Sequence, residues 1–339
     1  MPGHSADGDD RIIVHDRRSN GLPFSRGIMA TSLLATGIRT EEAYRLASLV
    51  QLALLDRGPR EVDAEELVAL THTTLATYAH DPDIADRWTA WRRAKRSGRP
   101  VVISLGGAAG TGKSTLATRL AVRLDITRVV TTDAIRDVLR TVVPDVVLPE
   151  LHASTFEVVE PDSPDPFAGF DRQCRAVGAA AVAVADRLAD EHRPVIVEGV
   201  HLLPGEMTTA LADHAAAPVV VERLIVQADR DRHTDLLQRR ETTEPLRRGD
   251  RHLARFDRIR SIQDHLVDAA TRFGVHVVDG GEAGDLTQDI VDEIVDRLAA
   301  STGSRRAPTT TSCVPNSNAA IGRGRGSTSW RTTAGPCGC

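Results

Sequence analysis

The chain has 339 residues, and its 42 lysines and arginines against 47 aspartates and glutamates give a formal charge of −5 at pH 7. A chain of this length can bury a full core and is expected to hold two domains. The mildly acidic charge gives no support for nucleic-acid binding, no apolar run is long enough to cross a membrane, and the polar start does not resemble a signal peptide. We therefore expect a cytoplasmic protein without nucleic-acid or membrane partners, and a homo-oligomer stays open.

The first part of the chain predicts a small, mostly helical domain. Residues 1–10 are polar and acidic, and we expect them to be disordered. Residues 11–92 open with a short apolar run and a polar turn, which favour a β-hairpin, and then show four stretches of helical apolar spacing, at 27–36, 40–55, 63–78 and 82–96. Residues 93–100, RAKRSGRP, are basic and contain Gly and Pro, so we interpret them as a linker.

Residues 101–115, VVISLGGAAGTGKST, carry the most specific motif of the chain. Val101–Leu105 is a β-branched apolar run that predicts a buried strand, and the following residues fit G-x-x-x-x-G-K-[ST] ahead of a helix. In this context backbone N–H groups hold the phosphates of a nucleoside triphosphate. The residues expected to bind ATP are Gly107, Ala108, Ala109, Gly110, Thr111, Gly112, Lys113, Ser114 and Thr115.

Two side chains of this loop have expected chemical roles. Lys113 should reach the β- and γ-phosphates as a catalytic residue, and the Ser114 hydroxyl should ligate Mg²⁺. The chain has only one other lysine, Lys95, so a lysine stands where the chemistry needs a flexible ammonium and not a planar guanidinium. The structural alternative is a chance glycine-rich turn before a helix. Lys95 is interpreted as part of the solvated linker.

A second strand is predicted at 128–131, and Asp133 follows where that strand gives way to a helix. Ligands of parallel α/β sheets lie at the carboxyl ends of the strands, so the Asp133 carboxylate is placed to orient and deprotonate an acceptor hydroxyl. The alternative role is a helix N-cap, which this position satisfies by itself. Arg136 and Arg140 share one helix face and are expected to bind an anionic acceptor, unless that face is only solvated.

The middle of the chain adds weaker candidates. Residues 144–170 contain five prolines and predict an ordered loop over the cleft, where His152 and Ser154 are candidates for acceptor binding. An alanine-rich helix follows at 171–191, with Cys174 interpreted as a small buried residue. The third strand, 194–198, ends in Glu198, which is placed either to hold a Mg²⁺-bound water or to pair with an arginine. His201 either touches the acceptor or only begins the next loop.

Arginines gather after a fourth predicted strand at 218–227. Two arginine-rich helices with a hinge between them, over about 229–256, have the layout of a kinase lid, which excludes water and brings guanidinium groups onto the transferring phosphoryl. Solvated, salt-bridged helices are the alternative for most of these arginines. The residues expected to act are Arg239 or Arg240 on the phosphoryl group, and Arg251 and Arg255 on the acceptor.

A fifth strand at 274–279 and a closing helix at 285–299 complete the second domain. Residues 300–339 are of low complexity and contain three of the four cysteines and five arginines without an acid, so we expect a disordered tail. Cys174 is the only cysteine outside this tail, which favours a reducing compartment. Five strands separated by helices across 101–299 predict a parallel α/β sheet with helices on both faces, the architecture of P-loop kinases.

Two family resemblances follow from these motifs. The polar turn and the residues after it, Asp16–Arg18, Pro23–Arg26 and Ala43–Tyr44, resemble the ATP-cone, a regulatory nucleotide-binding module. A helical cap that only packs on the kinase domain is the alternative. Residues 11–299 as a whole resemble the 2-phosphoglycerate kinase family. This resemblance rests on the N-terminal part just described together with the segments TTDAIRDVLR, LHAST and VIVEGVHLLPG and the arginine-rich tract.

The resemblance implies transfer of the ATP γ-phosphoryl, with Mg²⁺, to the free hydroxyl of 2-phosphoglycerate, giving 2,3-bisphosphoglycerate. A small phosphorylated hydroxy acid needs several arginines, which the chain offers. Two alternatives stay open: a kinase for another small acceptor, such as a sugar acid or a nucleoside, and a non-catalytic ATP-sensing regulatory protein.

Overall fold

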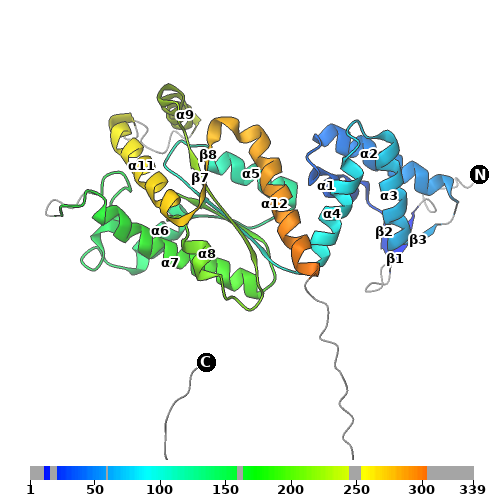
Figure 1. Ribbon diagram of the computed structural model, residues 1–339, viewed down its shortest axis with the longest axis horizontal. Coiled ribbons are helices and arrows are strands. Elements are labelled where there is room, and N and C mark those ends of the chain that lie inside the picture. The colour runs from blue at the N-terminus through cyan, green and yellow to red at the C-terminus, as the bar shows by residue number, and fades with distance from the viewer. Residues whose placement is uncertain (1–10, 16–20, 59, 159–162, 244–252, 304–339) are drawn as a thin grey trace, which may run out of the picture. The chain divides into compact units, whose positions relative to one another are not determined.

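The computed structural model describes residues 11–15, 21–58, 60–158, 163–243 and 253–303 (Figure 1). All of them belong to one compact unit, Met1–Ser304, and the second unit, Arg305–Cys339, lies outside the described residues. The expected disorder of residues 1–10 and of most of the tail therefore concerns residues that are not described. The final helix continues to Gly303, so residues 300–303 are helical and the predicted tail starts too early.

The predicted parallel sheet of five strands is confirmed. Each neighbouring pair of strands is parallel. In order across the sheet the strands are β5 (Val129–Thr131), β6 (Val195–Gly199), β4 (Val101–Gly106), β7 (Val219–Val226) and β8 (His276–Asp279). The strand that leads into the glycine-rich loop is thus the central one, and its carboxyl end is flanked by those of β6 and β7.

Helices cover both faces of the sheet, as predicted. They are α5 (Lys113–Leu124), α6 (Thr132–Val142), α7 (Ala168–Asp190), α8 (Glu206–Ala210), α9 (Arg230–Thr243), α11 (Phe256–Phe273) and α12 (Ala283–Gly303), with short 3-10 helices η1 (Pro149–His152) and η2 (Gly280–Glu282). The second lid helix, expected from about residue 250, begins at Phe256 in the described part of the chain, and the predicted hinge lies mostly outside it.

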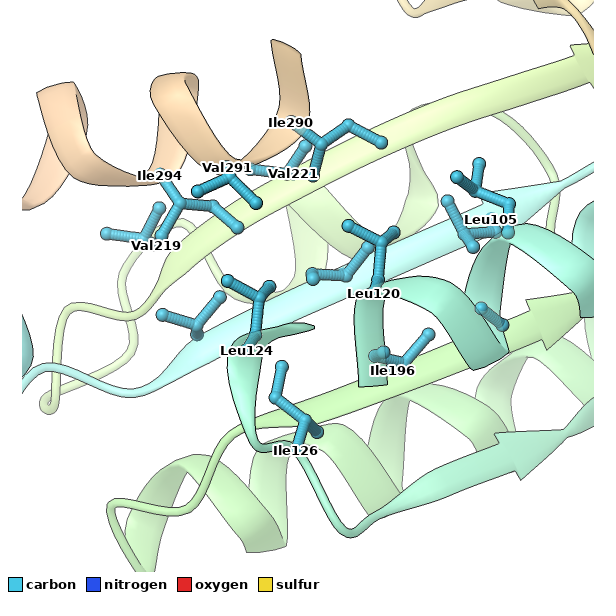
Figure 2. Close-up of a cluster of buried hydrophobic side chains, with 14 of the residues drawn as sticks. Leu105, Leu120, Leu124, Ile126, Ile196, Val219, Val221, Ile290, Val291 and Ile294 are labelled. Atoms are coloured by element: carbon cyan, nitrogen blue, oxygen red, sulfur yellow. The ribbon is translucent and has the colours of Figure 1, made fainter. Parts of the chain in front are cut away.

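The alternation of side chains along β4 explains the two-layered core. All six residues of β4 are buried, as expected of a central strand covered on both faces. Ile103 and Leu105 pack with α5 and α12, and Figure 2 shows this cluster, which includes Leu120 of α5 and Ile290 of α12. Val102 points to the other face, where it packs with alanines of α7. This packing fixes where the loop after β4 emerges.

The N-terminal module holds a small three-stranded sheet with the order β2-β1-β3. β1 (Ile13–His15) pairs antiparallel with β2 (Leu22–Pro23), in the expected hairpin, and parallel with β3 (Glu61–Asp63), which the sequence patterns did not indicate. The module's helices are α1 (Arg26–Leu34), α2 (Thr40–Asp56), α3 (Ala64–Tyr78) and α4 (Ile84–Arg96).

The helical stretch predicted at 82–96 is confirmed as α4, and it overlaps the first half of the linker predicted at 93–100. Helix α4 continues to Arg96 because Trp88, Trp91 and Ala94 keep its apolar spacing and are buried. Trp91 and Ala94 belong to the same buried cluster as β4, α5 and α12. None of the described helices is long and apolar enough to cross a membrane.

Candidate active site

The loop between β4 and α5 is shaped by glycines with positive φ angles. Gly107 has φ of 144°, and a Cβ built on it would lie 2.2 Å from the Ile225 carbonyl oxygen. Gly112, with φ of 92°, is the N-cap of α5. These left-handed conformations favour glycine and turn the backbone tightly onto the N-terminus of α5, where a phosphate group binds well.

Lys113 and Ser114 are the first two residues of α5. The Lys113 side chain is buried, and its Nζ donates a hydrogen bond to the Ala108 carbonyl oxygen at 2.7 Å, so the ammonium lies over the loop. The Ser114 hydroxyl donates to Oε1 of Glu198 at 2.9 Å. The two oxygens expected at Mg²⁺ are therefore neighbours, and hydroxyl and carboxylate oxygens are ligands that Mg²⁺ accepts. Among the described residues Glu198 is bonded to this serine and not to an arginine, the alternative partner.

The end of β6 brings the second wall of the site close to the loop. Glu198 lies opposite Leu105 of β4 and Thr131 of β5 in the sheet. Gly199 follows with φ of 153°, and a Cβ there would lie 1.8 Å from the Thr132 hydroxyl oxygen. Only glycine at this position lets the start of α6 approach the end of β6 so closely.

Helix α6 places the acceptor candidates. Its N-cap is Thr131, whose hydroxyl accepts a hydrogen bond from the Ala134 N–H at 3.2 Å, so the alternative of Asp133 as the N-cap is wrong. Asp133, Arg136 and Arg140 line one cleft together. Arg136 donates to the Ala153 carbonyl oxygen at 3.0 Å, which ties α6 to the loop before α7.

The cleft has a volume of about 390 Å³ and joins the glycine-rich loop to α6. The lining includes Lys113 and Ser114 of α5, Asp133, Arg136 and Arg140 of α6, and Ser154 of the loop between α6 and α7. The sequence patterns missed part of the lining because it comes from segments far apart in the chain. The missed residues are Thr131, Asp137, Thr155, Phe156, Gly199, Val200, Ile259 and Ile262.

Some predicted residues do not line this cleft. His152 lies in η1, where its Nε2 donates to the Val143 carbonyl oxygen at 2.9 Å, so its expected contact with the acceptor is not supported. Arg255 is the exposed N-cap residue of α11, and Arg239 is exposed on α9. Arg240 belongs to α9 but its side chain is not described, and Arg251 lies outside the described residues.

Two fully buried histidines are hydrogen-bonded to segments that line the site. His233 of α9 donates from Nε2 to the Ala109 carbonyl oxygen at 2.7 Å and so holds the glycine-rich loop. Burial lowers the pKa of this imidazole, which keeps it neutral. His201, after β6, is hydrogen-bonded to Thr132 and Thr155, next to residues of the acceptor side. A buried histidine carries no periodic sequence signal, so the sequence alone does not single out His233.

A phosphate-binding loop at the end of a central parallel strand, with a carboxylate and arginines across one cleft, defines an ATP-dependent phosphotransferase of the P-loop kinase class. A 2-phosphoglycerate kinase from Methanopyrus kandleri is 32% identical over 297 residues, which cover 86% of this chain and 89% of that protein. One from Pyrococcus horikoshii is 34% identical over 282 residues, covering 81% and 91%. The chain belongs to the 2-phosphoglycerate kinase family.

Other comparisons add little to that assignment. No protein-family model matches the chain. A solved shikimate kinase from Bacteroides thetaiotaomicron matches 60% of this chain and 98% of its own length, at 16% identity and a TM-score of 0.27. Because the chain belongs to a kinase family, it is an enzyme that acts on a small molecule. This assignment does not support the alternative of a non-catalytic ATP sensor.

Proposed function

We propose that this enzyme transfers the γ-phosphoryl group of ATP to the free hydroxyl of 2-phosphoglycerate and forms 2,3-bisphosphoglycerate. The observation that carries the proposal is the shared cleft, in which Asp133, Arg136 and Arg140 face the residues of the phosphate-binding loop. The names of the relatives support the same acceptor. 2-Phosphoglycerate carries a carboxylate and a phosphate, and an arginine guanidinium can form bidentate hydrogen bonds with either group.

The reaction is an in-line displacement. Asp133 accepts the proton of the acceptor hydroxyl while the oxygen of that hydroxyl forms a bond to the γ-phosphorus. The bond between the γ-phosphorus and the oxygen that bridges to the β-phosphate breaks, and ADP leaves with that electron pair. Lys113 stabilises the charge on the β- and γ-phosphates. The protein thus acts mainly by positioning and by charge, as expected of phosphoryl transfer.

Mg²⁺ is part of the proposal. The Ser114 hydroxyl and the Glu198 carboxylate would hold the ion or its bound water, since their oxygens lie 2.9 Å apart at the helix N-terminus. When bound, the ion neutralises charge on the phosphates.

We also retain the lid as a proposal. Arg239 or Arg240 would reach the transferring phosphoryl if α9 closes over the loop, and Arg251 and Arg255 would then face the acceptor. His233 of the same helix already contacts the loop, which makes α9 the element that would carry such a movement.

Substitution of the acceptor-side arginines tests the proposed substrate. Arg136→Ala should raise KM for 2-phosphoglycerate by about 10- to 100-fold, because a charge-assisted pair with an anionic group is lost. KM for ATP should stay within about twofold, since Arg136 belongs to the acceptor wall. ADP release is measured with 2-phosphoglycerate, 3-phosphoglycerate, glycerate, a sugar acid and a nucleoside. Faster turnover with one of the last two would contradict the proposed acceptor.

The N-terminal module has a cavity of its own, which favours a second role. It has a volume of about 440 Å³, and the last turns of α4 supply basic residues to one wall. We propose that a regulatory nucleotide binds there, with its base on the apolar wall and its phosphates toward the basic one. The apolar wall includes Val14, Leu22, Phe24, Ile28, Met29, Leu67 and Trp91, and the basic wall consists of Arg92, Lys95 and Arg96.

A further inference from the structure

His201 lies just beyond β6, is fully buried, and is absent from the lining of the active-site cleft. Its ring is hydrogen-bonded on both sides. Nδ1 lies 2.8 Å from the Thr132 hydroxyl, and Nε2 lies 3.1 Å from the Thr155 hydroxyl and 3.2 Å from Oε1 of Gln173. One side chain therefore joins three segments that are 28 to 69 residues away from it in sequence.

The bonding partners fix the protonation state of this ring. Gln173 donates its amide group to the carbonyl oxygens of Glu150 and Ala153, so its Oε1 must face His201 as an acceptor. Nε2 of His201 therefore carries the proton, and Nδ1 accepts a hydrogen bond from the Thr132 hydroxyl. Burial lowers the pKa of His201 to about 4, against a smaller raising effect of Asp133, so this tautomer is the neutral form.

Each partner of His201 adjoins an active-site residue. Thr132 precedes Asp133 at the start of α6, and Thr155 lines the cleft beside Ser154. Gln173 of α7 holds the carbonyl oxygen of Ala153, which also accepts the hydrogen bond from Arg136. The imidazole ring therefore links the α6 wall of the acceptor site to its loop wall, beside the direct hydrogen bond from Arg136 to Ala153.

We propose that His201 is a positioning residue that sets the spacing between Asp133 and the Ser154–Thr155 loop, and so determines how tightly the acceptor is held. The inference rests on the proposed function, in which this end of the cleft binds the acceptor. The ATP end does not depend on the ring, because Lys113 and Ser114 are positioned by α5 and by Glu198.

The test is His201→Gln, which keeps a donor amide but loses the rigid ring. KM for 2-phosphoglycerate should rise by about 10- to 100-fold, because displacements of about 1 Å have effects of that order, while KM for ATP stays within about twofold. His214→Gln is the matched control: that ring is also largely buried, but it pairs with Asp186 and Asp190 of α7 and does not line the cleft. The control should lower thermal stability without changing either KM.

Two milder variants keep the proposal testable if His201→Gln does not fold. Thr132→Val and Thr155→Val each remove one hydroxyl partner of the ring at nearly constant volume. Each should raise KM for 2-phosphoglycerate and leave KM for ATP unchanged, and Thr155→Val should add little to the rise that Thr132→Val causes, since both changes break the link through the same ring. Additive effects, or equal rises of both KM values, would show that His201 has only a structural role.

The behaviour of the wild-type protein separates this inference from the proposed function. If it phosphorylates a different small acceptor, the proposed substrate fails. The effect of His201→Gln on KM for that acceptor is then compared with its effect on KM for ATP. If it phosphorylates no acceptor in the presence of ATP, the proposed function and the role of His201 both fail.

Discussion

Asp133 is the residue whose proposed role is most specific to phosphoryl transfer. Thr131 caps α6, so the Asp133 carboxylate is not needed to start the helix and can serve the acceptor hydroxyl. Asp133→Asn should therefore lower kcat by about 10²- to 10⁴-fold, the usual contribution of a general base. The temperature of unfolding and the Kd for ATP should not change. A kcat close to that of the wild type would remove Asp133 from the mechanism.

The buried His201 ring also predicts a dependence of stability on pH. Its pKa in the folded protein, about 4, is lower than the ordinary value of 6.5, mainly because of burial. Above pH 6.5 the ring is neutral in both states. Between pH 6.5 and about 4 the unfolded chain binds a proton that the folded protein does not, so the free energy of unfolding falls as the pH falls.

This loss is measured as a difference between two proteins. From pH 7 to pH 4, urea unfolding of the wild type should lose about 3 kcal/mol more than that of His201→Gln. Glu206, whose pKa burial raises to about 7, titrates in both proteins and cancels in the comparison. Parallel pH profiles would mean that His201 titrates normally in the folded state.

At the scale of elements, runs of β-branched residues were enough to predict the five strands of the sheet, because each strand is short, apolar and bounded by Gly, Pro or polar residues. Two errors have physical causes. Residues 93–96 were predicted both as the end of a helix and as the start of a basic linker, and the linker prediction is wrong there because Trp91 and Ala94 are buried in α4. The three-residue strand β3 is stabilised by pairing with β1 and has no periodicity of its own.

The site was predictable where a local motif or the carboxyl end of a predicted strand marks it. The glycine-rich loop needs its residues at fixed spacing, so Lys113 and Ser114 follow from the sequence. Phe156 and Ile259 enter the cleft through the packing of distant segments, which a single sequence does not reveal. His152 differs from its neighbours in the same loop: Ser154 lines the cleft, but the His152 ring is hydrogen-bonded to the Val143 carbonyl oxygen and does not line it.

Helix α4 carries the prediction for the N-terminal module. If a nucleotide binds in the cavity beside it, calorimetry should give two ATP sites per chain for the wild type and one for a Lys95→Glu, Arg96→Glu double variant, because like charges would repel the phosphates. Arg93→Glu is the matched control, since Arg93 is exposed on the same helix but does not line that cavity.

The stoichiometry decides this prediction. The control should keep two sites, and Lys113→Ala should lose the other one, in the kinase cleft. A wild-type protein that binds a single ATP would leave the module as a cap that only packs on the rest of the chain.

At the scale of the molecule, the module and the kinase fold form one compact unit. Trp91 of α4 lies in the same buried cluster as Leu120 of α5 and Ile294 of α12. Deleting the module would therefore remove part of the packing behind α5, the helix that carries Lys113. Single charge changes on α4 are the cleaner way to separate regulation from stability.

The central claim is the identity of the reaction. The most direct measurement is ³¹P NMR of the products formed from ATP and 2-phosphoglycerate. We predict that 2,3-bisphosphoglycerate and ADP appear in equal amounts, and that Lys113→Ala lowers the rate at least about 100-fold, since one lost charge contact in the transition state is worth about 3 kcal/mol. ADP without a bisphosphorylated product, or an unchanged rate in Lys113→Ala, would contradict the account.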